Sequence, residues 1–103
     1  MDWAKYYIEQ LKMGKTVSFR PRGNSMRGKI GSGQLCTLEQ ANPSEIKSGD
    51  IVLCRVNGHS YLHLVKAIRG SGVDQQFLIG NNKGGINGWT GADHVFGYLV
   101  RVE

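Results

Sequence analysis

The chain has 103 residues, 40% of them hydrophobic, which is the length of one domain and the composition of a folded protein rather than a disordered one. Its longest uninterrupted apolar runs are three or four residues, such as Ile51 to Cys54, whereas a membrane helix needs roughly 20, so a membrane-spanning protein is excluded. No basic-then-apolar secretory signal opens the chain, so we expect a soluble, cytoplasmic protein that does not act at a membrane.

The formal net charge of +5 is unevenly distributed. Residues 1–29 carry seven Lys or Arg and two acidic side chains, whereas the rest of the chain is balanced, with six of each. The basic residues nearest the serine discussed below are Arg20, Arg22, Arg27 and Lys29. Such a patch attracts nucleic acid or an acidic peptide, or it is simply a solvated face. Few aromatic residues interleave with these charges, so we expect at most weak, non-specific nucleic-acid binding.

Residues 1–15 form the expected N-terminal helical segment. Trp3, Tyr7, Ile8 and Leu11 recur at helical spacing and predict a helix over residues 2–12 that ends before Gly14. A helix this short is not stable alone, so we expect its apolar stripe to dock, by default on the remaining domain.

Residues 16–103 have the signals of a β domain. Alternating or apolar runs separated by turn residues predict strands over 16–20, 34–39, 51–56, 59–68, 76–79 and 95–102. Asn57-Gly58 between two apolar runs predicts a two-residue hairpin with Val52 opposite His63. Short strands with frequent turns favour a mainly β fold, closed as a small barrel or packed as a sandwich.

A glycine- and asparagine-rich stretch follows the fifth predicted strand. Residues 80–91 contain five glycines and three asparagines, and we interpret them as one long loop. Loops of this length in compact domains usually carry function or are disordered.

The two cysteines, Cys36 and Cys54, each lie in an apolar, strand-like run. With no secretory signal and no Cys-x-x-Cys motif, they are predicted to be reduced core thiols, with a disulfide as the alternative. No cluster of ligands has the spacing of a metal site, and no phosphate-binding loop is present, so we expect neither a metal nor a cofactor.

The segment Gly23-Asn24-Ser25-Met26 is the most informative part of the chain. It follows a predicted strand, and a serine between small and polar residues can be exposed on a tight turn, as a nucleophile requires. Serines in such turns are common, so the segment alone does not establish catalysis.

The order of five short blocks adds a resemblance. The blocks are Gly23-x-Ser25-Met26, Ser48-Gly49-Asp50-Ile51-Val52, Leu62-His63-Leu64-Val65, Leu78-Ile79-Gly80-Asn81-Asn82 and Phe96-Gly97-Tyr98-Leu99-Val100. They are spread along roughly residues 16–102, and in their order they resemble the motifs of the signal peptidase I and LexA-type serine peptidases. The resemblance implies a small β-barrel with a shallow peptide groove at the serine.

The resemblance implies that Ser25 is the nucleophile and that His63 is at the position of the general base, which is a lysine or a histidine in other members. It also implies that Gly23, Asn24 and Met26 line the substrate groove. A histidine near pKa 7 suits the removal of a proton from a serine hydroxyl. The alternative is that His63 is only a hydrogen-bonded residue at the rim of the β domain.

The chain departs from the family where an acidic residue orients the base. Asn81 and Asn87 stand at the family's acidic positions, and Asp93 is the only carboxylate nearby in sequence. An amide orients an imidazole but cannot stabilise imidazolium by charge.

The first hypothesis is therefore a serine peptidase with a Ser–His dyad that cleaves a protein or peptide. The alternatives are a catalytically impaired binding module that contacts protein or nucleic acid through its basic N-terminal segment, and a structural subunit; the oligomeric state stays open.

Overall fold

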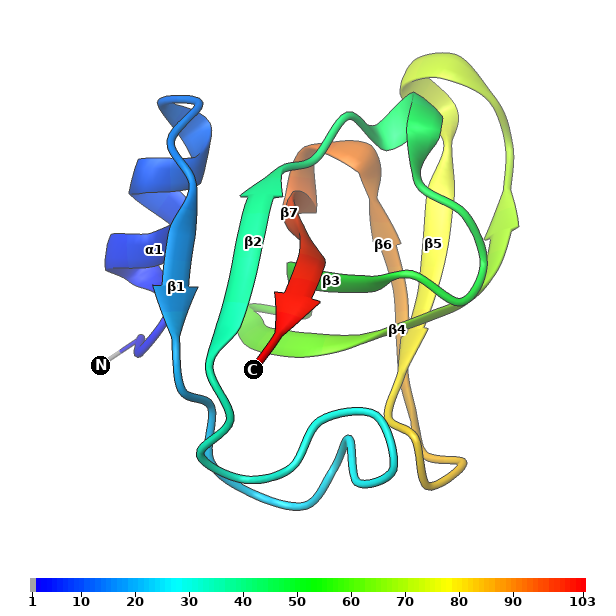
Figure 1. Ribbon diagram of the computed structural model, residues 1–103. Coiled ribbons are helices and arrows are strands. Elements are labelled where there is room, and N and C mark those ends of the chain that lie inside the picture. Colours follow the sequence, from blue (N-terminus) through cyan, green and yellow to red (C-terminus); the bar gives the residue numbers. More distant parts are fainter. Residues whose placement is uncertain (1) are drawn as a thin grey trace.

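The computed structural model describes residues 2–103 as one antiparallel sheet of seven strands in the order β1-β2-β7-β3-β4-β5-β6, with a single α-helix beside it (Figure 1). The elements are α1 (Lys5–Lys12), β1 (Val17–Phe19), β2 (Cys36–Gln40), β3 (Ile51–Val56), β4 (His59–Arg69), β5 (Gln76–Gly80), β6 (Ile86–Gly91) and β7 (Val95–Val102), with short 3-10 turns at Pro43–Glu45, Gly72–Asp74 and Ala92–His94. The predicted mainly β class is confirmed. Within residues 2–103, no pairing joins β1 to β6, so the sheet is not closed and barrel closure is not shown.

The β3–β4 hairpin has the predicted register. Val52 pairs with His63, and Val56 pairs with His59 on either side of the turn. Asn57 and Gly58 have φ of +50° and +81°, as a type I′ turn requires of both central residues. This local turn sets which residues of β4 share a face, and therefore where His63 lies.

The prediction of one long loop over residues 80–91 is wrong. Ile86–Gly91 forms β6, which pairs with β5 through Phe77↔Thr90 and Ile79↔Gly88, so the connection is only a short turn. This Gly- and Asn-rich segment has a low strand propensity, but its backbone hydrogen bonds to β5 stabilise it as a strand. The Arg69 guanidinium also stacks over Trp89, 3.9 Å from the ring centroid.

The helix packs on the sheet, as predicted, although it begins at Lys5 rather than at residue 2. Ile8 and Leu11 are buried in a core cluster that includes β-strand residues such as Leu38 and Leu53. A second buried cluster, which contains Val52, forms a separate part of the core.

Cys36 and Cys54 are free and fully buried, and they belong to different core clusters. The prediction of reduced core thiols is confirmed, and the alternative of a disulfide is wrong. Burial raises the pKa of both thiols, that of Cys54 to about 12. No helix within residues 2–103 has the length and apolar character that crossing a bilayer requires.

Candidate active site

Ser25 lies on the long connection between β1 and β2, where the chain makes a series of turns (Figure 1). Met26 and Ile30 are 5% and 4% exposed and anchor this connection in the core, while Ser25 itself is exposed. The Ile30 N–H donates to the Met26 carbonyl over 2.8 Å, which closes a turn directly after the serine. The burial of Met26 and Ile30 therefore fixes the position of this connection, and with it the position of Ser25.

The turn between β5 and β6 is hydrogen-bonded to the connection between β1 and β2 that carries Ser25, called the serine connection below. The Asn82 N–H donates to the Ser25 carbonyl over 2.8 Å, and the Asn82 side-chain amide donates to the Arg27 carbonyl over 2.7 Å. Sequence reasoning assigned no role to Asn82, because a contact across 55 residues has no local signal. Its two hydrogen bonds tie the candidate nucleophile to the sheet.

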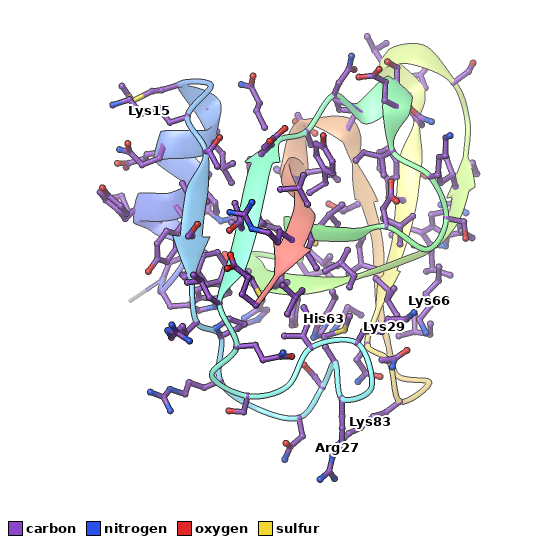
Figure 2. The ribbon with its side chains drawn as sticks, in the orientation of Figure 1. Lys15, Arg27, Lys29, His63, Lys66 and Lys83 are labelled. Carbon is purple, nitrogen blue, oxygen red and sulfur yellow. The ribbon has the colours of Figure 1, made fainter. Side chains whose placement is uncertain are left out.

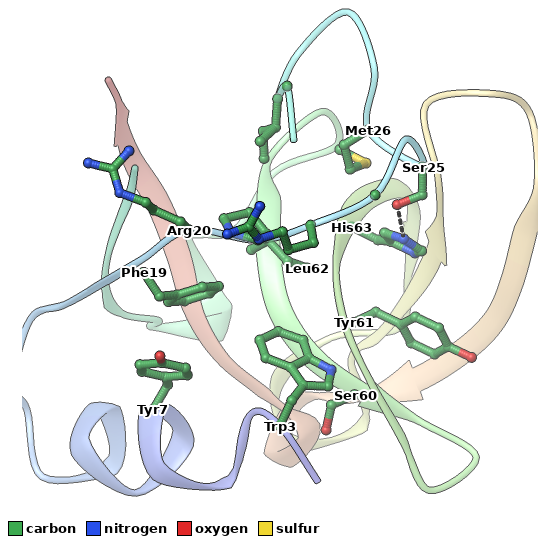
Figure 3. A pocket seen from close by; sticks show the side chains of 15 residues that line it. Trp3, Tyr7, Phe19, Arg20, Ser25, Met26, Ser60, Tyr61, Leu62 and His63 are labelled. Carbon is green, nitrogen blue, oxygen red and sulfur yellow. Dashed lines mark hydrogen bonds between the residues drawn. The ribbon is translucent and has the colours of Figure 1, made fainter. Parts of the chain in front are cut away.

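His63 extends from β4 toward Ser25, with its Nε2 3.1 Å from Ser25 Oγ (Figure 3). The two side chains thus lie within the hydrogen-bond distance that a nucleophile and its base require. His63 is 8% exposed, and its ring stacks on Tyr61, two residues earlier on the strand, with ring centroids 5.0 Å apart. The stacking partner and the rigid strand restrict the orientation of the ring.

The second ring nitrogen of His63 is bound by Asn87 of β6. His63 Nδ1 lies 2.7 Å from Asn87 Oδ1, and because this oxygen only accepts, Nδ1 carries the proton. The lone pair of Nε2 then faces the Ser25 hydroxyl. Burial lowers the pKa of His63 below its ordinary value, and the hydrogen bond to Asn87 opposes that shift in part. The site thus holds a neutral imidazole in the tautomer that accepts a proton from serine.

The other two residues expected to orient the base do not do so. Asn81 Oδ1 accepts from the backbone N–H groups of Lys83 and Gly85, each at 2.8 Å, and so closes the β5–β6 turn. Asp93 is exposed in the 3-10 turn before β7. Both nitrogens of His63 are already engaged by Ser25 and Asn87, so these two expectations are wrong.

A pocket of about 470 Å³ opens beside the dyad (Figure 3). Gly23 and Met26 line it, as expected for a groove. Asn24 is exposed and is not part of its lining; its carbonyl accepts from the Arg27 N–H and closes a turn instead. The Gly23 N–H donates to Ser32 Oγ at 3.2 Å, so it is not free to serve as an oxyanion donor.

The far wall of the pocket is aromatic, and sequence reasoning did not predict it. Trp3, Tyr7 and Phe19 line it, although Trp3 and Tyr7 were expected only as the docking stripe of the helix. The signal in the sequence was the concentration of aromatic residues before Ser25, but only the packing of α1 beside β1 brings them to the serine.

The basic residues near Ser25 divide into two groups. Arg20 and Arg22 line the pocket, whereas Arg27 and Lys29 are exposed farther along the serine connection. In Figure 2, Lys83 of the β5–β6 turn lies near Arg27, whereas Lys29 lies closer to Lys66. Lys15, after α1, lies at the opposite end of the molecule in that view. The N-terminal positive charge is therefore not one continuous patch.

Residues 2–103 contain no group of three or more His, Cys, Asp or Glu side chains that could hold a metal ion. Neither the models of known protein families nor the curated proteins compared with the chain give a match.

Proposed function

We propose that this protein is a serine peptidase that hydrolyses a peptide bond in a protein or peptide substrate through Ser25 and His63. The observation that carries the proposal is the chain of two hydrogen bonds through one buried imidazole, from Ser25 Oγ to Nε2 and from Nδ1 to Asn87 Oδ1. Nucleophile, base and orienting group in this order are the geometric signature of nucleophilic acyl transfer.

The proposed reaction has two halves. Ser25 Oγ attacks the scissile carbonyl carbon while its proton passes to His63 Nε2. His63 then gives this proton to the leaving amine as the carbon–nitrogen bond breaks, which leaves an acyl ester on Ser25. A water molecule, deprotonated by the same nitrogen, hydrolyses the ester and restores the serine. The Ser25 backbone N–H is the candidate donor to the oxyanion.

An asparagine as the orienting group is compatible with this chemistry. Papain-like peptidases use a Cys–His–Asn constellation, in which an amide holds the base. Asn87 contributes orientation and tautomer selection to His63, but no charge to stabilise the imidazolium. We therefore propose a dyad with a positioning residue, and slower turnover than a full triad gives.

Two further observations support a peptide as the substrate. β5 pairs with β4 only from Leu64 to Arg69, so the edge of β4 before Leu64 has no strand partner on that side within residues 2–103. An extended peptide can pair with such an edge, which here leads to His63. The pocket beside Ser25 can take a side chain of that peptide.

The resemblance to the signal peptidase I and LexA-type peptidases belongs to this proposal, and so do the barrel-like closure and the cytoplasmic setting that it suggests. The two free, buried cysteines are compatible with a reducing compartment. The asparagines at positions 81 and 87, where that family carries acidic residues, are the main departure from it.

A fluorophosphonate probe tests the proposal, because it labels only an activated serine. The wild type is expected to be labelled, and Ser25→Ala and His63→Ala are expected to lose the label while circular dichroism shows that they remain folded. Ser71→Ala is the matched control, since Ser71 is also an exposed serine beside glycines in a turn. A folded wild type that is never labelled, or equal labelling of Ser25→Ala, would refute the peptidase.

A binding module on the same fold is the second candidate. It is favoured by the neutral amide of Asn87 beside the base, and by three exposed cations, Arg27 and Lys29 on the serine connection and Lys83 of the β5–β6 turn. A mobility-shift titration with duplex DNA at two salt concentrations tests it. Binding that weakens steeply with salt and is lost in Lys29→Ala and Lys83→Ala would support this candidate. The absence of binding at low salt would remove nucleic acid as the partner.

A further inference from the structure

The pocket beside Ser25 ends in an open aromatic wall. Tyr7 and Phe19 stack with ring centroids 4.4 Å apart, and Trp3 lies 5.6 Å from Phe19. Phe19 is 7% exposed, whereas Trp3 is 49% exposed. About half of the surface of Trp3 is thus accessible, and Trp3 lines the pocket (Figure 3). Burial of such a surface against an apolar ligand group is favourable.

The position of this wall is fixed before any ligand binds. The Asp2 carboxylate forms an ion pair with Arg55, accepts a hydrogen bond from Ser60 Oγ at 3.1 Å, and accepts another from the Ala4 N–H at 3.0 Å. Arg55 and Ser60 are cross-strand neighbours on β3 and β4. Asp2 therefore attaches the segment before α1 to the sheet, and Ala4, which is fully buried in the core, anchors the other side of Trp3. A rigid wall of this kind lowers the entropic cost of binding.

The charge of the pocket has one sign. Arg20 and Arg22 line it, and none of the described residues that line it is acidic. Arg20 is held in place by donation from Nη1 to the Gly33 carbonyl at 2.9 Å, and Arg22 is exposed. Guanidinium groups at a pocket rim pair well with carboxylates, often through two hydrogen bonds.

We infer that this pocket selects peptide segments in which a bulky apolar side chain stands beside acidic residues close to the scissile bond. The apolar side chain packs against Trp3, Tyr7 and Phe19, and the carboxylates pair with Arg20 and Arg22. The inference rests on the proposed function for cleavage, but the binding preference itself requires only the pocket.

Binding to the Ser25→Ala variant, which cannot cleave, measures this preference. The probes are four fluorescein-labelled octapeptides that differ only at two adjacent central positions, Phe-Glu, Phe-Lys, Ala-Glu and Ala-Lys, followed by fluorescence polarisation. We expect the Phe-Glu peptide to bind tightest, and each replacement to weaken binding about tenfold or more, the effect of one buried apolar side chain or one well-paired charge.

Variants of the wall assign each preference to its residues. On the Ser25→Ala background, Trp3→Ala is expected to remove the preference for Phe over Ala, and Arg22→Ala to weaken that for Glu over Lys. Tyr6→Ala and Lys15→Ala are the matched controls, because both residues are exposed and neither lines the pocket. Trp3→Leu, which keeps an apolar wall, should retain part of the preference for Phe even if Trp3→Ala disturbs the fold.

The outcomes separate this inference from the proposed function. If the peptides bind in the expected order but the wild type is never labelled by fluorophosphonate, the peptidase fails and the pocket preference stands. If the wild type is labelled but the four peptides bind equally, the inference is wrong. Single-stranded DNA that binds tighter than the Phe-Glu peptide, and loses affinity in Trp3→Ala, would overturn it in favour of base stacking.

Discussion

Asn87 Oδ1 lies 2.7 Å from His63 Nδ1, at the position where a full catalytic triad holds a carboxylate oxygen. The amide gives the imidazole the same orientation and tautomer as a carboxylate would, without its negative charge. Since burial already lowers the pKa of His63, the ring stays neutral over a wider pH range, but the imidazolium of the proposed reaction would be less stabilised.

Substitutions at Asn87 should separate orientation from charge. Asn87→Ala is expected to slow fluorophosphonate labelling by about 10²-fold or more, because the ring then lacks its orienting partner. Asn87→Asp adds a negative charge beside His63 and should raise its pKa, so the acid limb of the labelling rate moves to higher pH. The pH profile of labelling measures both. Equal rates for Asn87→Ala and the wild type would show that Asn87 does not position the base.

Acid should destabilise the protein through His63. Its pKa is lowered in the folded state from 6.5, so the unfolded chain binds the proton more readily. The free energy of unfolding is therefore flat above about pH 6.5 and decreases as the pH falls below it, with a slope of at most about 1.4 kcal/mol per pH unit for one proton. The hydrogen bond to Arg55 lowers the pKa of the Asp2 carboxyl in the folded state. This group therefore decreases the free energy of unfolding only at lower pH, as the pH falls below its ordinary pKa of 3.8.

Urea denaturation at several pH values between 5 and 8 measures this dependence. His63→Gln is expected to flatten the decrease, while His59→Gln, a substitution at an exposed histidine, should keep it. An unchanged curve in His63→Gln would contradict the assignment.

Gly97 of β7 is the contact point for the helix. A Cβ at this position would lie 2.6 Å from Leu11 Cδ1 and 3.1 Å from the Glu39 carbonyl oxygen. Gly97→Ala is therefore expected to destabilise the fold by about 1–3 kcal/mol through overpacking, measured by urea denaturation. Adding Leu11→Ala to Gly97→Ala should cost less than the sum of the two single changes, since the clash is then relieved. Additive costs would show that α1 does not rest on Gly97.

The β3–β4 turn offers a test of backbone strain alone. Gly58 has φ of +81°, and a Cβ there would meet no atom within 4 Å. Gly58→Ala should cost about 1 kcal/mol from the left-handed conformation, and Gly58→Asn less, because asparagine tolerates this region. Thermal or urea denaturation of the two variants checks the order, and equal stability of Gly58→Ala and wild type would contradict the turn type.

The two thiols should be unreactive in the folded protein. Cys36 and Cys54 are fully buried, and burial raises the pKa of Cys54 to about 12, so almost no thiolate is present at neutral pH. A disulfide-exchange reagent is expected to modify both only after urea unfolds the chain. Rapid modification of either thiol in native buffer would show that it is accessible to solvent.

The local signals in the sequence were sufficient for most of the secondary structure. Apolar runs bounded by turn residues predict β3 and β7 with their observed bounds, and Asn57-Gly58 predicts the hairpin register, because a two-residue turn leaves one pairing. The mainly β class follows from the same patterns. The sequence proposes Ser25 through its motif, and His63 through its place in a series of motifs.

Only the tertiary structure decided which group orients His63. The sequence leaves Asn81, Asn87 and Asp93 all as candidates, and the choice depends on β6, a strand that local propensity does not predict. Because β6 is stabilised by its ladder to β5, its existence and its register are non-local, and so is the placement of Asn87 beside the base. The aromatic wall has the same origin. Trp3 and Phe19 are 16 residues apart in the chain, and they meet only because α1 buries its apolar face beside β1.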